Sequence, residues 1–210
     1  MWRGNESNMM QYDPKIHHRR SIRLKGYDYS QAGAYFITIC CHDKECRFGI
    51  IEDCVSYADS QIELNEYGTI AYNKWLKLPE RFSNFDLDVF QIMPNHIHGI
   101  IILTEPVTNA GTVGARFTRA PYNADDFDNR TRVNRVPTVD ATIGDIVGAY
   151  KSLVANACLE IYKSKNEIMG KFWQRNYHEH IIRNEQSYQT ISDYIINNPA
   201  KWNDDKFFMK

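Results

Sequence analysis

The chain lacks any long uninterrupted run of apolar residues, although apolar residues make up 43% of its 210 positions. No segment approaches the roughly 18–20 apolar residues that span a bilayer. The N-terminal stretch is polar and lacks the apolar block of a signal peptide. We therefore expect no membrane partner and a cytoplasmic location. The composition is typical of a globular protein with room for one ordinary domain.

Cysteine is scarce and irregularly spaced, with five residues in all. An odd count without regular spacing gives no disulfide framework, and the paired CxxC motifs of many structural zinc sites are absent. One interpretation places zinc between Cys41, His42, Cys46 and Cys54. The simpler interpretation is that these are reduced thiols on a strand and on the loop that follows it.

A net charge of only −1 at pH 7 disfavours a protein that coats nucleic acid without specificity. The basic residues are nevertheless unevenly distributed. Between Pro14 and Tyr27 there is no acidic residue, and the basic residues are Lys15, Arg19, Arg20, Arg23 and Lys25. Such a cluster can neutralise phosphates, and it can equally be a solvated surface.

The spacing of the apolar residues predicts the order strand, helix, strand, strand, helix, strand, helix. The strands are expected at 34–41, 86–93, 96–103 and within 172–182, and the helices within 57–79, 142–162 and about 185–197. The first six elements have the ferredoxin-like β-α-β-β-α-β order, an α+β fold whose antiparallel sheet has two helices on one face. The apolar run at 96–103 indicates a central strand.

We expect residues 31–202 to form a single domain, with a basic arm at 1–30 and a short tail at 203–210. Residues 105–140 contain scattered Gly, Pro, Asn, Asp and Arg with little periodicity. This stretch is too long for a routine connection, which predicts a functional loop or an insertion.

The segment MPNHIHGII contains two histidines that are two residues apart on an expected strand. Side chains alternate between the faces of a strand, so His96 and His98 point the same way and Ile97 points to the other face. Two imidazoles in this arrangement can hold one divalent cation. The alternative is a pair of buried histidines satisfied by hydrogen bonds.

A second segment, SDYIINNPAKW, ends the last expected helix. Tyr194 and Asn198 are four residues apart and therefore share a helix face. The amide oxygen of Asn198 suits a hard cation such as Mg²⁺ or Mn²⁺. Alternatively, Tyr194 is a core residue and Asn-Asn-Pro simply ends the helix.

Three blocks of sequence in this order resemble the single-tyrosine HUH transposases, and within them the REP-associated tyrosine transposases. The blocks are RRSIRLKGYDYSQAGAYFITI, MPNHIHGI and FWQRNYHEHIIRN…YIINNPAKW. The resemblance covers roughly residues 15–202 and is weakest over 105–140. It implies a metal-dependent endonuclease and transposase that cuts single-stranded, hairpin-flanked DNA. The implied intermediate is a 5′-phosphotyrosine, and relatives act as monomers or as homodimers.

By this resemblance His96 and His98 are metal ligands and Tyr194 is the nucleophile. Asn198 takes the place of a third ligand, for which Asn197 and Gln174 are alternatives, and the expected cofactor is Mg²⁺ or Mn²⁺. The residues expected to contact DNA are Arg19, Arg20, Arg23 and Lys25.

The main alternative function is a domesticated protein that binds hairpin DNA without transposing it. A metal hydrolase that uses water in place of Tyr194 is another. RNA binding is disfavoured, because the RNP-type aromatic motif is missing from the expected strands Ala34–Cys41 and Ile97–Leu103.

Overall fold

A four-stranded antiparallel sheet with the strand order β4-β5-β1-β6 forms the centre of the molecule. The computed structural model describes residues 23–24, 26–51, 62–105 and 141–208. The strands of the sheet are β1 (Gly33–Cys40), β4 (Phe85–Ile92), β5 (His96–Leu103) and β6 (His178–Ile182). Because β5 lies between β4 and β1, the segment expected to be a central strand is central.

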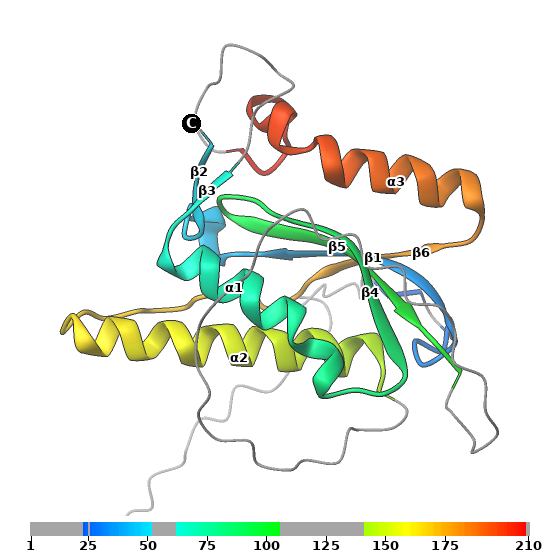
Figure 1. Cartoon of the computed structure of the whole chain (residues 1–210), viewed down its shortest axis with the longest axis horizontal. Coiled ribbons are helices and arrows are strands. Elements are labelled where there is room, and N and C mark those ends of the chain that lie inside the picture. Colours follow the sequence, from blue (N-terminus) through cyan, green and yellow to red (C-terminus); the bar gives the residue numbers. More distant parts are fainter. Residues whose placement is uncertain (1–22, 25, 52–61, 106–140, 209–210) are drawn as a thin grey trace, which may run out of the picture.

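In the described part of the chain three α-helices flank the sheet, with α1 and α2 on one face and α3 on the other (Figure 1). They are α1 (Glu66–Leu76), α2 (Ile143–Ser164) and α3 (Glu185–Asn197). Around the sheet the elements follow the order β1-α1-β4-β5-α2-β6, which confirms the predicted ferredoxin-like α+β fold and its additional C-terminal helix.

Shorter elements connect this framework. A separate two-stranded sheet consists of β2 (Gly49–Ile51) and β3 (Ile62–Leu64). The sequence pattern groups Ile62 and Leu64 with the following helix, but these residues form β3. The helix α1 begins after them, with Asn65 as its N-cap. The 3-10 helices among the described residues are η1 (His42–Lys44), η3 (Leu78–Glu80) and η4 (Pro199–Asp204).

The main core lies between the sheet and the pair α1 and α2. Trp75 of α1 and Tyr150 of α2 are fully buried and meet edge to face, with their ring centroids 5.0 Å apart. A second, smaller cluster joins Ile195 of α3 to Ile100 and Ile182 on the opposite face of the sheet. The sheet is thus covered on both faces, and α3 is placed over the face that carries the even-numbered residues of β5.

Gly99 of β5 allows Trp75 to pack directly on the sheet. A Cβ atom at this position would lie 2.6 Å from Cζ2 of Trp75, whose ring is held against Tyr150. We expect Gly99→Ala to lower the free energy of unfolding by about 1–3 kcal/mol, because the indole must move. Urea denaturation measures this change.

Gly148→Ala on α2 is the matched control, since an added Cβ there meets no described atom within 4 Å. It should leave stability unchanged or raise it by up to about 1 kcal/mol, given the helix propensities of the two residues. If Gly99→Ala proved equally harmless, the close approach of the indole would not constrain this position.

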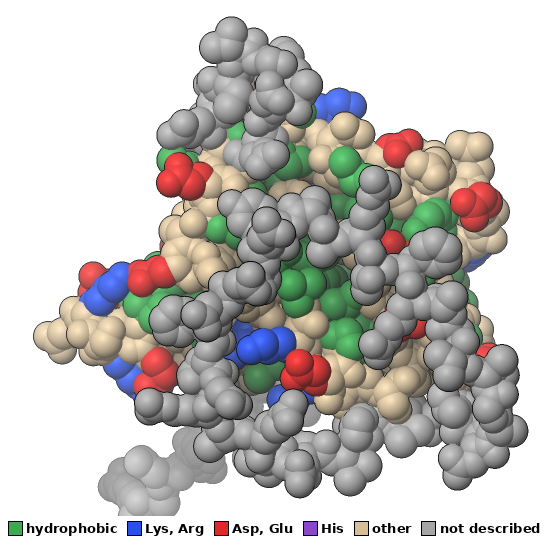
Figure 2. All heavy atoms as spheres, viewed as in Figure 1, with side chains coloured by type: hydrophobic (Ala, Val, Ile, Leu, Met, Phe, Trp, Pro, Cys, Tyr) green, Lys and Arg blue, Asp and Glu red, His purple; other side chains and the backbone are tan. Residues whose placement is uncertain are grey.

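The surface of the described residues mixes both signs of charge. In the view of Figure 2, Lys and Arg side chains are interspersed with Asp and Glu side chains around apolar surface. Within the described ranges, no helix is long and apolar enough to cross a membrane. The expected loop or insertion at 106–140 lies outside the described residues.

Candidate metal and nucleophile site

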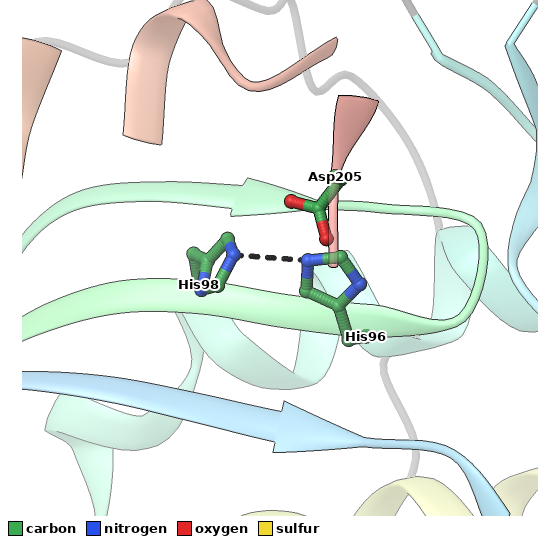
Figure 3. Close-up of side chains that lie close together, drawn as sticks. All are labelled: His96, His98 and Asp205. Carbon is green, nitrogen blue, oxygen red and sulfur yellow. Dashed lines mark hydrogen bonds between the residues drawn. The ribbon is translucent and has the colours of Figure 1, made fainter. Parts of the chain in front are cut away.

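His96 and His98 lie side by side on the face of β5 that is covered by α3. Their Nε2 atoms are 2.9 Å apart, and the side chains are fully buried (Figure 3). Ile97, between them, belongs to the main core on the other face of the sheet. The alternation predicted from the sequence is therefore confirmed for this segment.

Burial keeps both imidazoles uncharged. It lowers the pKa of His96 to about 3, and the positive charges of Lys206 and Lys44 act in the same direction. Burial also lowers the pKa of His98 well below its usual value, with the neighbouring His96 as a further cause. Neutral imidazoles are the form that binds a metal ion.

Each histidine ring is fixed by a hydrogen bond at its Nδ1 atom, the ring nitrogen that faces away from the other histidine. Nδ1 of His96 lies 2.8 Å from Oδ1 of Asn95, and Nδ1 of His98 lies 2.9 Å from Oγ1 of Thr38 on β1. Asn95 and Thr38 are themselves buried. The two Nε2 atoms consequently face a common point, which is the arrangement usual for histidines that share a metal ion.

Tyr194 projects from the last turns of α3 toward this pair. Its hydroxyl oxygen is 3.2 Å from Nε2 of His98, and its ring packs against those of His98 and Phe36 at centroid distances of 5.1 and 6.1 Å. The residue is 39% exposed, so the phenol is reachable from solvent. Partial burial, together with the negative charge of Asp205, raises its pKa to about 12.

Asp205, just after η4, brings a carboxylate to the same place. One of its oxygens and a ring nitrogen from each of His96 and His98 lie within 4.8 Å of one another (Figure 3). Its Oδ2 atom accepts a hydrogen bond from Asn198 at 3.0 Å and lies 3.4 Å from the Tyr194 hydroxyl. Sequence reasoning missed Asp205, since residues 203–210 were expected to be a tail.

Asn198 caps the C-terminus of α3 and shares a helix face with Tyr194, as predicted. Its side chain is buried, and among the described residues Oδ1 has no hydrogen-bond partner. A buried carbonyl oxygen without a partner is costly unless a cation or water satisfies it. The two neutral imidazoles and the carboxylate fit a divalent cation that accepts nitrogen and oxygen ligands, and Asn198 lies beside them through its hydrogen bond to Asp205.

An open pocket of about 410 Å³ gives access to these groups. Its lining residues are Phe36, His98, Tyr194, Asn198, Lys201, Asp204, Asp205 and Lys206. The two lysines add positive charge at the rim of a site that contains two carboxylates. Such a pocket suits an anionic ligand whose charge is partly neutralised by a bound cation.

Two other tyrosines, and the alternative ligand Asn197, lie away from the histidines. Tyr162 of α2 stacks on Tyr67 at a centroid distance of 5.1 Å, on the other side of the sheet. Tyr188 donates a hydrogen bond to Asp88. Asn197 is exposed and donates to the backbone of Asp193, one turn earlier. Of the tyrosines compared, only Tyr194 reaches the histidines.

The cysteines do not assemble a second centre within the described ranges. Cys40, Cys41 and Cys158 are buried free thiols and Cys46 is an exposed one. None of these four belongs to a group of three or more potential metal ligands in the part of the chain that is described. Cys54, which the zinc interpretation requires, lies outside the described residues.

Arg23 is the one described residue of the basic cluster assigned to DNA contact, because Arg19, Arg20 and Lys25 lie outside the described residues. Its Nε atom lies 3.4 Å from Oε1 of Glu179, whose side chain is only 3% exposed. It also donates a hydrogen bond to the hydroxyl of Tyr177. Arg23 therefore compensates a buried carboxylate on β6, a role that the local sequence did not indicate.

We expect Arg23→Met to lower the free energy of unfolding by about 1–3 kcal/mol, because the buried carboxyl group of Glu179 would lose the cation beside it. Chemical denaturation measures the change. Adding Glu179→Gln to Arg23→Met should restore part of the loss. Unchanged stability of Arg23→Met would leave DNA contact as the better explanation of this arginine.

Fold and site together define an α+β protein with a candidate divalent-metal site beside an accessible tyrosine. No protein-family model matches the chain. An uncharacterized protein of Haemophilus influenzae is 40% identical over 200 residues, which cover 94% of this chain and 97% of that protein. The chain belongs to the same family as this Haemophilus influenzae protein.

Two solved structures are similar at a lower level. One is a REP-associated tyrosine transposase bound to a REP hairpin, 19% identical, with a TM-score of 0.47 over 88% of this chain and 76% of that one. The other, from Deinococcus radiodurans R1 and provisionally assigned as a transposase, is 15% identical, with a TM-score of 0.37 over 83% of this chain and 95% of that one. At these scores the likeness carries no inference about function.

Proposed function

We propose that this protein is a metal-dependent nuclease and strand transferase for single-stranded, hairpin-flanked DNA, with Tyr194 as its nucleophile. One observation carries the proposal: the Tyr194 hydroxyl lies 3.2 Å from Nε2 of His98, which is itself 2.9 Å from Nε2 of His96. These are the three residues to which the resemblance to single-tyrosine HUH transposases gives catalytic roles. The proposal is compatible with a monomer or a homodimer acting in the cytoplasm.

The ligands of the cation would be Nε2 of His96 and of His98, together with oxygens of Asn198 and Asp205. Mn²⁺ or Mg²⁺ would suit this mixed set of nitrogen and oxygen ligands and could also accept phosphate oxygens or water. When bound, the cation supplies positive charge that stabilises the charge developing on the attacked phosphate.

Tyr194 is protonated at neutral pH, since its pKa is raised to about 12. It therefore needs a proton acceptor, and Oδ2 of Asp205 lies 3.4 Å from its hydroxyl. As the phenol proton moves to Asp205, the phenolic oxygen bonds to phosphorus and the bond from phosphorus to the 3′ oxygen breaks. The 3′ oxygen leaves with the electron pair and takes up a proton, which gives a free 3′-OH.

The product is a 5′-phosphotyrosine, another phosphodiester, so the energy of the cleaved linkage is retained. A 3′-OH from a second strand can attack it and reverse the step, which joins two strands without ATP. Lys201 and Lys206, at the rim of the pocket, would attract the flanking phosphates. Unpaired DNA is required at the cut, because the phosphate must reach a phenol inside the pocket.

A nicking assay tests this proposal. The substrate is a pool of single-stranded oligonucleotides in which a hairpin is flanked by randomised unpaired positions, incubated with the protein and Mn²⁺. We expect one released fragment with a free 3′-OH and a second fragment joined through its 5′ phosphate to the protein, with mass spectrometry mapping the attachment to Tyr194. A domesticated hairpin-binding protein would instead retard the DNA in a native gel without cutting it.

A further inference from the structure

We infer that Asn95 and Thr38 are positioning residues with different tasks. Asn95 fixes the ring hydrogen of His96 on Nδ1 in every state. The hydroxyl of Thr38 donates a hydrogen bond to Nδ1 of His98 when no cation is bound and accepts one from it when a cation is bound. His98 can therefore carry its ring hydrogen on Nε2 without a cation and on Nδ1 with one. The cation-dependent half of this inference rests on the proposed function, whereas the hydrogen positions in the metal-free protein do not.

The Asn95 side chain is fully buried and has a single possible orientation. Its Nδ2 atom donates to two backbone carbonyl oxygens, that of Lys44 at 3.0 Å and that of Phe207 at 2.8 Å. A carbonyl oxygen accepts only, so the amide nitrogen must face both. Oδ1 then faces Nδ1 of His96 at 2.8 Å, and since Oδ1 also accepts only, Nδ1 of His96 must carry the hydrogen.

This assignment determines which ring nitrogen of His98 carries its hydrogen. A neutral His96 with its hydrogen on Nδ1 presents a lone pair on Nε2, 2.9 Å from Nε2 of His98. Two lone pairs at that distance would repel each other, so the hydrogen between them belongs to Nε2 of His98. The bare Nδ1 of His98 then accepts the hydroxyl hydrogen of Thr38 at 2.9 Å.

Cation binding requires a lone pair on both Nε2 atoms. His96 already offers one. His98 must lose the proton on Nε2 and gain one on Nδ1, which leaves the ring neutral and takes up or releases no net proton. Its Nδ1–H then needs an acceptor, and the Thr38 hydroxyl becomes one by rotating about its C–O bond. The Asn95 side chain could become a donor to His96 only by turning its amide over, which would break both of its hydrogen bonds to backbone carbonyl oxygens.

Proton–nitrogen NMR spectra of protein containing isotope-labelled histidine test the hydrogen positions directly. In the metal-free protein we expect His96 to be protonated on Nδ1 and His98 on Nε2. With Zn²⁺ as a diamagnetic probe, His98 should move its hydrogen to Nδ1 while His96 does not change. Metal-free protein with His96 protonated on Nε2, or with His98 already protonated on Nδ1, would overturn the inference.

Thr38→Val isolates the hydroxyl, because valine has nearly the same shape and is well accommodated in strands. We expect the variant to fold and to bind Mn²⁺ about 10- to 100-fold more weakly in calorimetry, as is usual when a hydrogen-bond partner of a metal-binding histidine is removed. Thr38→Ser, which retains the hydroxyl, should recover most of the affinity. In both variants the hydrogen of His96 should stay on Nδ1.

Wild-type affinity in a folded Thr38→Val variant would refute the role of Thr38. A different outcome separates this inference from the proposed function. If the wild-type protein showed the expected metal-free hydrogen positions but bound neither Mn²⁺ nor Zn²⁺, the assignment of hydrogens would stand, and both the proposed function and the cation-dependent reversal would fail.

Discussion

Tyr194→Phe should abolish the covalent protein–DNA adduct and reduce cleavage by at least about 10⁴-fold, the scale on which loss of a nucleophile reduces turnover. Phenylalanine keeps the ring that packs against Phe36 and His98 and removes only the hydroxyl. Folding and binding of hairpin DNA should therefore be unchanged. Denaturing gels of end-labelled substrate measure adduct and cleavage together.

Tyr188→Phe is the matched control, on the same helix. It removes a hydroxyl that bonds to Asp88, away from the histidines, and cleavage should remain. Cleavage retained by Tyr194→Phe would mean that water is the nucleophile, which is the metal-hydrolase alternative. Loss of cleavage in both variants would point to a general disturbance of α3 instead.

The elements with strong periodicity were predicted well from the sequence. The observed bounds of β5 and α3 coincide with the expected segments 96–103 and 185–197. The apolar run of β5 covers the whole strand, and the helical spacing of α3 extends over several turns, so each pattern is long enough to be recognised. By contrast, β2 and β3 have three residues each, too few for a pattern to show. Local periodicity therefore located the elements that carry the histidines and the tyrosine, but it missed the two short strands.

The remainder of the site depends on contacts between distant segments. Asp205 follows a 3-10 helix that has no apolar pattern, and it is placed by hydrogen bonds such as that from Asn95 to the carbonyl of Phe207, 112 positions later. The partner of Arg23, Glu179, is equally remote in sequence. A charge count could not show that Arg23 compensates a buried carboxylate, because the burial of Glu179 arises only when β6 joins the sheet.

Asp205→Asn should weaken Mn²⁺ binding on the order of 100-fold in calorimetry, because it removes a negative charge from a site whose other proposed ligands are neutral. The substitution keeps the size of the side chain and its capacity to accept from Asn198, so the fold should be preserved. Single-strand cleavage should fall as well, since the proposed proton acceptor for Tyr194 is lost together with the ligand.

Asp204→Asn is the matched control for charge. Asp204 also lines the pocket, but it is not part of the group formed by His96, His98 and Asp205. Both substitutions change the net charge equally, so a difference between them reports coordination and not long-range attraction. Asn198→Ala should weaken Mn²⁺ binding less than Asp205→Asn does, because it removes a neutral oxygen and leaves the negative charge of Asp205 in place. If Asp205→Asn bound Mn²⁺ like the wild type and only cleaved more slowly, Asp205 would be a proton acceptor alone, and Asn198 would be the third ligand.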